Sequence, residues 1–231
     1  TEPIFWDKKK TSILSIVLYP FSILVIGYTN LLKLKSTKRF KVPTLCVGNI
    51  YIGGTGKTPI SIKIFEILKS KGFKPAFIKK YYPFLSDEIK ILEQFGKVFK
   101  GKNRVLNMKR LEKDNFDIAI MDDGFQDYSV HKDFSIICFH ENQLIGNGKV
   151  IPAGPLRESI TSVKRANIIM INGQKNKKFE EYLLRFNQKL LFFYFKYKIS
   201  IDYNLENKHV VAFAGIGNPK NFFELLKKES I

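Results

Sequence analysis

A glycine-rich run in the first part of the sequence combines the residue types that bind phosphate. The run is Gly53-Gly54-Thr55-Gly56-Lys57-Thr58. Glycines let backbone N–H groups turn toward phosphate oxygens, and the start of a helix adds partial positive charge. In a loop of this kind the lysine reaches the β- and γ-phosphates of a nucleotide, and the hydroxyl after it ligates Mg²⁺. We therefore predict an ATP-binding loop formed by these residues, with Thr58 also a metal ligand.

The run departs at one position from the strict phosphate-binding motif. That motif begins with a glycine where this sequence has Tyr51, and the nearest upstream glycine is Gly48. A chance glycine-rich turn is the alternative interpretation. The context favours the phosphate loop, because the run follows a predicted strand and opens a predicted helix.

Two adjacent carboxylates end an apolar run further along the chain. Residues Ile118–Met121 are followed by Asp122, Asp123 and Gly124. A buried strand that ends in acids places a carboxylate near the metal of a P-loop enzyme. We predict that both acids are catalytic residues and that Asp122 ligates Mg²⁺, directly or through water. A β-turn built on Asp-Gly is the alternative.

A proline-rich turn precedes a single arginine. In the segment 151–158, Pro152, Gly154 and Pro155 come before Arg157. The planar donor fork of arginine suits phosphate binding and stabilisation of a transferring phosphoryl group. We predict that Arg157 is catalytic. The alternative is a surface arginine that pairs with Glu158 or another nearby acid.

The elements that must position these motifs are short apolar strands alternating with amphipathic helices. Strands are expected at 44–50, 76–78, 117–121, 135–139 and 167–171. Helices are expected at 59–71, 87–95, 103–113 and after 178, followed by an aromatic run at 190–197, a strand at 209–214, a turn at 215–219 and a last helix. This alternation predicts an α/β fold of the P-loop NTPase type, with a mainly parallel sheet and helices on both faces.

An uncharged segment of 22 residues, 11–32, lies near the N-terminus. It has the length of a membrane-crossing helix, but Pro20 interrupts it, and Ser15, Ser22 and Thr29 recur on one helical face. Such a polar stripe suits a helix in the membrane interface or a span packed against protein. More basic residues follow the segment than precede it, which favours a cytoplasmic position for the downstream part. A buried helix of a soluble protein is the alternative.

Three regions follow from these features. Residues 1–41 form a membrane-associated helix with a basic flank, 42–173 form a P-loop kinase core, and 174–231 form a smaller C-terminal region. A polar run at 173–178 marks the second boundary.

Composition limits the classes of partner. The 231 residues include 39 Lys and Arg against 21 Asp and Glu, a formal net charge of +18, which favours anionic partners such as acidic lipid or phosphorylated substrates. No nucleic-acid-binding signature is present, so we expect no nucleic-acid partner, and nothing implies an obligate protein partner. Cys46 and Cys138 lie inside predicted strands, where we expect two buried free thiols. No Cys/His spacing suits zinc.

The motifs together resemble those of the tetraacyldisaccharide 4′-kinase family, the lipid A kinases of Gram-negative bacteria. The matching segments are Val47-Gly48-Asn49, the glycine-rich run with Pro59, Asp122-Asp123-Gly124-Phe125-Gln126, and Pro152-Ala153-Gly154-Pro155-Leu156-Arg157-Glu158. The resemblance covers almost the whole chain. It implies transfer of the ATP γ-phosphate to the 4′-hydroxyl of a lipid-linked disaccharide, tetraacyldisaccharide 1-phosphate, to form lipid IVA. The resemblance also implies that the enzyme acts at the cytoplasmic face of the inner membrane.

Further residues are assigned only by this resemblance. Ser86-Asp87-Glu88 is similar to the family's Gly-Asp-Glu-Pro segment, which makes Asp87 the expected catalytic base for the sugar hydroxyl. The family's Ser-Arg-Gly-Tyr segment corresponds to Lys79-Lys80-Tyr81-Tyr82, and its histidine after Asp-Asp-Gly-x-Gln to Asp127. The family's later histidine has no counterpart, so we expect the region 174–231 to be incomplete relative to the family. A membrane-associated P-loop ATPase or GTPase switch acting on a protein partner is the alternative function. The sequence has no guanine-specific Asn-Lys-x-Asp motif to support it.

Overall fold

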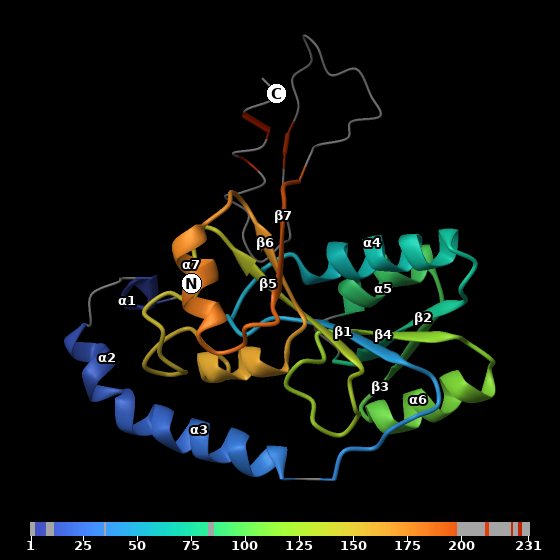
Figure 1. Cartoon of the computed structure of the whole chain (residues 1–231), viewed down its shortest axis with the longest axis horizontal. Helices are drawn as coiled ribbons and strands as arrows, with labels where there is room; N and C mark the ends of the chain where they lie inside the picture. The colour runs from blue at the N-terminus through green and yellow to red at the C-terminus, as the bar shows by residue number, and fades with distance from the viewer. Residues whose placement is uncertain are drawn as a thin grey trace.

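The computed structural model describes residues 3–7, 12–34, 36–82 and 86–197, together with residues 211, 212, 223, 226 and 227. Its centre is a seven-stranded sheet in the order β3-β2-β4-β1-β5-β6-β7, with every pairing parallel (Figure 1). The strands are β1 (Thr44–Gly48), β2 (Pro75–Lys80), β3 (Val98–Gly101), β4 (Ile118–Asp122), β5 (Phe134–His140), β6 (Ile168–Asn172) and β7 (Leu191–Phe195). The predicted parallel α/β fold is confirmed.

The strand order reverses at β1, which lies between β4 and β5. In open parallel sheets of this kind, ligands bind beyond the carboxyl ends of the strands at such a reversal. The register places Val47 of β1 beside Asp122 of β4, so the two strands end together. The glycine-rich run and the acidic pair therefore emerge side by side from the sheet.

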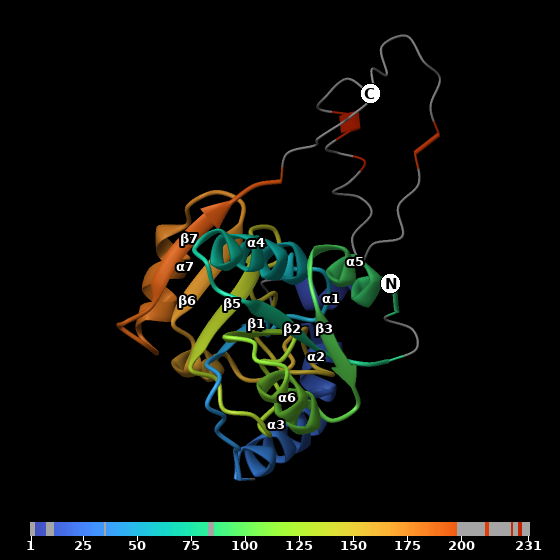
Figure 2. The same cartoon turned by 90° about the vertical axis from the view of Figure 1, so that its right-hand side faces the viewer.

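Helices cover both faces of the sheet (Figure 2). On one face, α4 (Lys57–Ser70) and α5 (Ser86–Phe95) bury apolar residues such as Phe65 and Leu92 against Phe77 and Ile120. On the other face, α6 (Arg104–Lys113) and α7 (Lys177–Leu184) pack on the opposite side chains of the same strands. Strands with both faces covered are apolar throughout, which is why continuous apolar runs located them in the sequence.

Several elements differ from the prediction. Helix α4 begins at Lys57, two residues before the predicted start, because the phosphate loop runs directly into it. Strand β3 was not predicted, since its four residues contain too little pattern to recognise. Strand β7 pairs with β6 across the polar run at 173–178, so the first part of the region 174–231 continues the sheet. The strand at 209–214, the turn at 215–219 and the last helix lie outside the described residues, apart from residues 211, 212, 223, 226 and 227.

The N-terminal segment is not the single helix of 22 residues that its uncharged length suggested. It follows a four-residue turn of helix, α1 (Ile4–Asp7), and forms α2 (Ile13–Val17) and α3 (Tyr19–Lys33). The break lies at Leu18, two residues before Pro20, because proline is tolerated in the first turn of a helix but not in its interior. Among the described residues no helix has the length and apolar character needed to cross a membrane.

The polar stripe on these two helices faces the protein. Ser15 and Ser22 are fully buried, and their hydroxyls donate hydrogen bonds to the carbonyls of Ala153 (2.7 Å) and Val150 (2.8 Å). Thr29 instead donates to the carbonyl of Ile26 in its own helix. The two serines thus attach α2 and α3 to the loop after β5.

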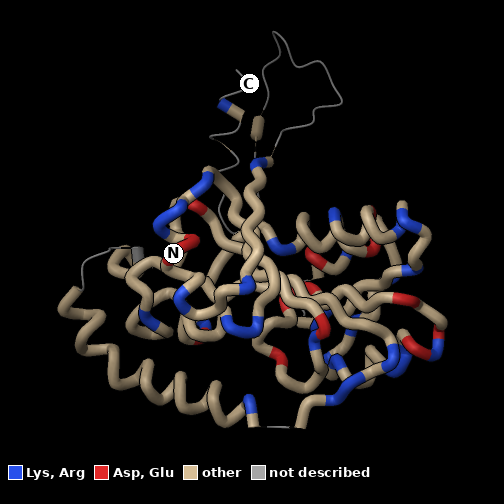
Figure 3. The backbone as a smooth tube through the Cα atoms, in the orientation of Figure 1, with Lys and Arg blue, Asp and Glu red and all other residues tan. Residues whose placement is uncertain are grey.

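The outward face of α2 and α3 is apolar. Leu24, Leu31 and Ile13 are 71%, 65% and 81% exposed. The other large exposed apolar side chains here are Leu14, Ile16, Val17, Tyr19, Phe21, Ile23, Tyr28 and Leu34. The tube in Figure 3 carries no charge along this segment until Lys33 at its end. A continuous exposed apolar surface of this kind marks a contact with a partner or a membrane.

The two cysteines lie in the sheet as predicted. Cys46 in β1 and Cys138 in β5 are both fully buried and unbridged. Burial raises the pKa of the Cys46 thiol to about 11 and that of Cys138 to about 12. Both therefore remain neutral thiols inside the core.

Candidate active site

The phosphate loop connects the end of β1 to the start of α4. Gly53 and Gly56 have φ values of 113° and 84°, a left-handed region that side chains with a Cβ rarely adopt. The side-chain amide of Asn49 donates to the carbonyls of Tyr51 (2.6 Å) and Gly53 (3.2 Å), which holds the loop in its turn. These two hydrogen bonds define the turn of the loop from within the protein.

The structure explains the departure from the strict motif. A Cβ on Gly48 would lie 2.5 Å from the Cβ of Phe125, so glycine is needed where the loop leaves the sheet. Tyr51 is completely buried and forms an isolated bridge with Leu156. Gly48 thus allows Phe125 to pack closely against the start of the loop. Tyr51 connects the loop to the turn that carries Arg157.

The interior of the loop suits an anion. The Thr55 hydroxyl is buried and has no hydrogen-bond partner among the described residues. Helix α4 begins with Gly56 as its N-cap and points its free N–H groups into the loop. The ammonium of Lys57, 12% exposed, projects into the same region. These donors fit a phosphate group, which would satisfy both the helix start and the unpaired hydroxyl.

Asp122 ends β4 beneath the loop and is fully buried. One carboxylate oxygen, Oδ1, accepts a hydrogen bond from Ser61 (2.8 Å). The other, Oδ2, lies 3.4 Å from the Thr58 hydroxyl and forms a short contact with the ammonium of Lys79. Hydroxyl and carboxylate oxygens next to a phosphate loop are the donors that Mg²⁺ prefers, so Thr58 and Asp122 fit the predicted metal.

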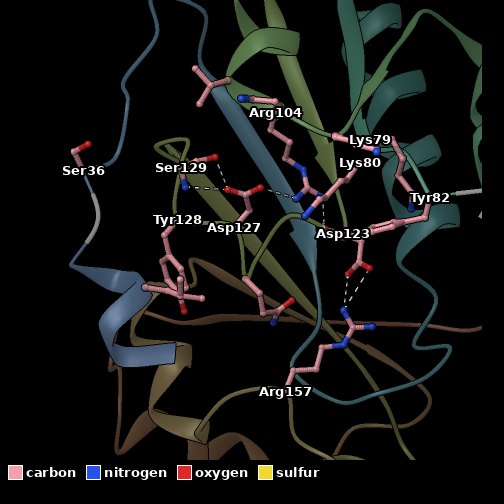
Figure 4. Close-up of a pocket in the computed structure, with 15 residues that line it drawn as sticks. Ser36, Lys79, Lys80, Tyr82, Arg104, Asp123, Asp127, Tyr128, Ser129 and Arg157 are labelled. Atoms are coloured by element: carbon pink, nitrogen blue, oxygen red, sulfur yellow. Dashed lines mark hydrogen bonds and ion pairs between the residues drawn. The ribbon is translucent and has the colours of Figure 1, made fainter. Parts of the chain in front are cut away.

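Asp123 follows in a left-handed backbone conformation, with φ of 52°. Its N–H donates to the carbonyl of Val47 (2.9 Å), and its carboxylate turns toward two cations. Arg157 Nη1 donates to Oδ1 at 3.0 Å (Figure 4). Lys57 Nζ lies 3.8 Å from the same oxygen. Burial alone would raise the pKa of Asp123, but Lys57 and Arg157 lower it. The carboxylate is therefore ionised and links the phosphate loop to the arginine.

The proline-rich turn is attached to the phosphate loop by backbone hydrogen bonds. Arg157 donates its N–H to the carbonyl of Ile50 (2.7 Å), and Ile52 donates to that of Pro155 (2.9 Å). Glu158, 1% exposed, turns the other way and accepts hydrogen bonds from Arg165 and Tyr128. Arg157 therefore does not pair with Glu158, which was one of the alternatives left open by the sequence. It pairs with Asp123 instead.

A cavity of about 780 Å³ lies beside the acidic pair, and Figure 4 shows Asp123 and Arg157 among the residues around it. It extends from the acidic pair to the end of α3. Its lining residues are Leu32, Ser36, Lys79, Lys80, Tyr82, Lys102, Asn103, Arg104, Val105, Asp123, Gln126, Asp127, Tyr128, Ser129 and Arg157. Basic side chains outnumber acids in this set, and two tyrosines add flat polar surfaces.

Arg104 and Asp127 form an ion pair on the wall of this cavity. Arg104 Nη1 donates to Asp127 Oδ2 at 2.8 Å, and its Nη2 donates to the carbonyl of Asp123 at 2.7 Å. Burial alone would raise the pKa of Asp127, but hydrogen bonds from Ser129 and Arg104 lower it to about 2. The pair fixes the chain just after the acidic motif.

Asp87 is not brought into this cluster. It lies in the first turn of α5 with its side chain 92% exposed, and the nearest charged partner is Lys90 at 3.9 Å. Its neighbour Glu88 points inward instead and accepts a hydrogen bond from Lys79 at 2.6 Å. The predicted role of Asp87 as base stays a prediction, while the other predicted site residues gather around the phosphate loop.

Sequence reasoning missed Lys79 and Arg104 as members of the site. Lys79 is 2% exposed at the end of β2, and Arg104 is 6% exposed at the start of α6. Burial alone would lower the pKa of Lys79, but Asp122 and Glu88 raise it, so the side chain is charged. The only sequence signal was a lysine near the carboxyl end of an apolar strand, the edge of a parallel sheet beyond which ligands bind.

Fold and site together define a P-loop nucleotide-binding protein. They combine a parallel sheet that reverses at β1, a phosphate loop before α4, and an acidic pair at the end of β4. The crystal structure of the LpxK protein of Aquifex aeolicus in complex with ATP has the same fold. It superimposes with a TM-score of 0.71 at 24% identity, covering 95% of this chain and 79% of that protein.

Comparison of sequences identifies the family within this class. The family model described as tetraacyldisaccharide-1-P 4′-kinase matches residues 14–84 and 84–231. The tetraacyldisaccharide 4′-kinase of Pelagibacter ubique is 40% identical over 236 residues, covering 100% of this chain and 74% of the relative. The corresponding protein of Francisella tularensis subsp. novicida is 33% identical, covering 98% and 81%. The chain belongs to the tetraacyldisaccharide 4′-kinase family.

Proposed function

We propose that the chain transfers the γ-phosphate of ATP to the 4′-hydroxyl of tetraacyldisaccharide 1-phosphate and so forms lipid IVA. The single observation that supports this most is the placement of Lys57, Asp123 and Arg157. They meet between the phosphate loop and a basic cavity of about 780 Å³. A nucleotide and an anionic acceptor would therefore meet at the same carboxylate.

The phosphate loop holds the nucleotide in this proposal. Lys57 contacts the β- and γ-phosphates, and the N–H groups of Gly53, Gly54 and Gly56 turn toward them. The unpaired Thr55 hydroxyl completes the set of donors. Thr58 and Asp122 would hold Mg²⁺, which when bound would neutralise charge on the phosphates.

Transfer then needs positioning more than covalent chemistry by the protein. The acceptor oxygen forms a bond to the γ-phosphorus, the bond from that phosphorus to the β–γ bridging oxygen breaks, and ADP leaves. Arg157 stabilises the charge on the transferring group, and Asp123 orients Arg157 and Lys57. The proton of the hydroxyl goes to a carboxylate base, for which family resemblance favours Asp87. The other candidates are the acidic pair, Asp122 and Asp123, of which Asp123 lines the cavity.

The cavity beside Asp123 takes the acceptor sugar. Lys80, Lys102 and Arg104 line it and provide positive charge for a phosphorylated substrate. Its far end reaches Leu32 and Ser36, next to the exposed apolar face of α3. A lipid with a phosphorylated sugar headgroup would therefore place its sugar in the cavity and its acyl chains along the helix.

The N-terminal helices associate with the membrane in this proposal. Their apolar side chains face outward while Ser15 and Ser22 face the protein, the reverse of a helix on a soluble surface. A helix with one apolar face lies in the membrane interface without crossing it. We place the chain at the cytoplasmic face of the inner membrane, with no obligate protein partner.

Incubation of the purified chain with labelled ATP, Mg²⁺ and tetraacyldisaccharide 1-phosphate tests the proposal. Label in the lipid supports the kinase. Release of free phosphate without label in the lipid would instead indicate an ATPase switch and overturn the proposed transfer. The absence of both products would show that this chain does not carry the activity.

A further inference from the structure

Lys79 places a positive charge of the protein next to the predicted metal ligands. Its ammonium is buried between the carboxylates of Asp122 and Glu88, with 2.6 Å to Glu88 Oε2. The residue lies on β2, outside the three motifs that point to phosphate chemistry.

The ammonium and the Thr58 hydroxyl share one oxygen. Asp122 Oδ2 contacts Lys79 and lies 3.4 Å from Thr58 Oγ1, while Oδ1 is held by Ser61 at 2.8 Å. The carboxylate therefore presents to Thr58 an oxygen that a cation already neutralises.

We propose that Lys79 is a positioning residue whose charge competes with Mg²⁺ for Asp122, and that Glu88 sets the strength of this competition. The proposal rests on the proposed function in one respect, the assignment of Thr58 and Asp122 as metal ligands. It adds a determinant of metal affinity that lies outside the phosphate loop and the acidic pair.

Substitutions of Lys79 and of Glu88 should shift the affinity for Mg²⁺ in opposite directions. Loss of the Lys79 charge removes repulsion of a divalent cation, so metal binding becomes tighter. Loss of the Glu88 charge leaves the ammonium less neutralised and bound more firmly to Asp122, so metal binding becomes weaker. Because Glu88 is 44% exposed, solvent screens its charge and its effect is the smaller of the two.

A merely structural lysine would not give this pattern. If Lys79 served only to fill and neutralise the interior, both substitutions would lower the melting temperature. The two substitutions would then not change the affinity for Mg²⁺ in opposite directions. The sign of the two shifts therefore separates a competing charge from a packing role.

The experiment measures the melting temperature of the full chain at a series of Mg²⁺ concentrations, with a saturating non-hydrolysable ATP analogue present. The Mg²⁺ midpoint is the concentration that gives half of the full shift in melting temperature. Lys79→Gln keeps a hydrogen-bond donor but removes the charge, and we expect its Mg²⁺ midpoint to fall about threefold or more. Glu88→Gln should raise the midpoint about twofold. Glu93→Gln is the matched control, because Glu93 also lies on α5 and pairs with a strand lysine, Lys100, at 2.7 Å. Its midpoint should equal that of the original chain.

The outcomes separate this proposal from the one on which it rests. Suppose that Mg²⁺ shifts the melting temperature of the original chain, but the midpoints of both variants are unchanged or move in the same direction. The proposal that Lys79 competes with Mg²⁺ is then overturned, and the kinase proposal stands. If Mg²⁺ has no effect on the original chain, the assigned metal site is overturned, and this proposal with it. Should Lys79→Gln fail to fold, the midpoint of Glu88→Gln decides: an increase supports the proposal, and an unchanged or lower value overturns it.

Discussion

Arg157 and Asp123 lie 34 positions apart in sequence, and Arg157 Nη1 contacts Asp123 Oδ1 at 3.0 Å. The contact joins the turn at 151–158 to the end of β4, and Lys57 extends it to the phosphate loop at 3.8 Å. Three segments of the chain thus meet at one carboxylate. A defect in any one of them should be visible in the same reaction.

Substitution of Arg157 tests this meeting point directly. Arg157→Ala should lower kcat by about a hundredfold or more, because it removes a fixed cation aimed at the transferring group. Arg157→Lys should recover only part of the loss, since an ammonium lacks the planar fork. The check is the rate of label transfer to the lipid at saturating ATP. A kcat near that of the original chain would remove Arg157 from the site.

Lys57→Ala should abolish transfer and leave the fold intact, because the side chain contributes to phosphate binding and not to the core. Transfer of label measures the first effect, and circular dichroism measures the second. Lys63→Ala is the matched control, since Lys63 lies on the same helix and is 69% exposed. Activity near that of the original chain in Lys57→Ala would contradict the phosphate-loop assignment.

Asp87→Ala should lower turnover more than ATP affinity if Asp87 is the base. Its side chain is 92% exposed, so the acceptor must bring the hydroxyl to it, and nucleotide binding should not depend on it. Steady-state kinetics that separate kcat from the KM for ATP measure this, with Lys90→Ala as the control for its surface pair. An unchanged turnover would move the base to Asp122 or Asp123.

Asp127 should contribute to stability in a pH-dependent way. Its pKa falls to about 2 in the folded chain against about 3.9 in the unfolded chain, so its contribution is complete above about pH 5 and is lost as the pH falls toward and below about 2. Asp127→Asn should therefore lower the free energy of unfolding at pH 7, and the difference should vanish at low pH. Urea unfolding at several pH values measures it. A difference independent of pH would show that the charge of Asp127 is not what stabilises the fold.

The two faces of α3 should respond differently to substitution. Leu24→Glu with Leu31→Glu should abolish binding to vesicles of anionic phospholipid, since both side chains face outward. Ser22→Ala should retain vesicle binding but lower the free energy of unfolding by about 1–3 kcal/mol, because it leaves the N–H of Ala153 unpaired and removes one of two hydrogen bonds to the carbonyl of Val150. Vesicle sedimentation and chemical unfolding measure the two effects. Vesicle binding unchanged by the two glutamates would contradict the membrane proposal.

The parts of the fold that the sequence predicted correctly have local causes. Continuous apolar runs located β1, β4, β5 and β6, because strands buried on both faces must be apolar at every position. The phosphate loop was recognisable because its glycines and lysine stand between a strand and a helix. The choice between Arg157 as a site residue and as a surface residue needed the structure, since it depends on which way two adjacent side chains turn.

The parts that were missed depend on contacts distant in sequence. The partners of Lys79 come from β4 and α5, and no spacing along β2 reveals them. The outward position of Asp87 follows from the rotation of α5 on the sheet, which buries Ile89 and Leu92 instead. The serine stripe of α2 and α3 could have faced either the membrane interface or the protein. It faces the protein, because the carbonyls of Val150 and Ala153 accept hydrogen bonds from the two serines.

The serine contacts of α2 and α3 also affect how the protein behaves outside water. Apolar packing between a helix and its domain gains its strength from exclusion of water, and it loses that advantage when detergent or lipid surrounds the helix. The hydrogen bonds from Ser15 and Ser22 to the carbonyls of Ala153 and Val150 have the opposite dependence, since a low-dielectric medium strengthens them. The helices should therefore keep their alignment with the catalytic domain during detergent extraction.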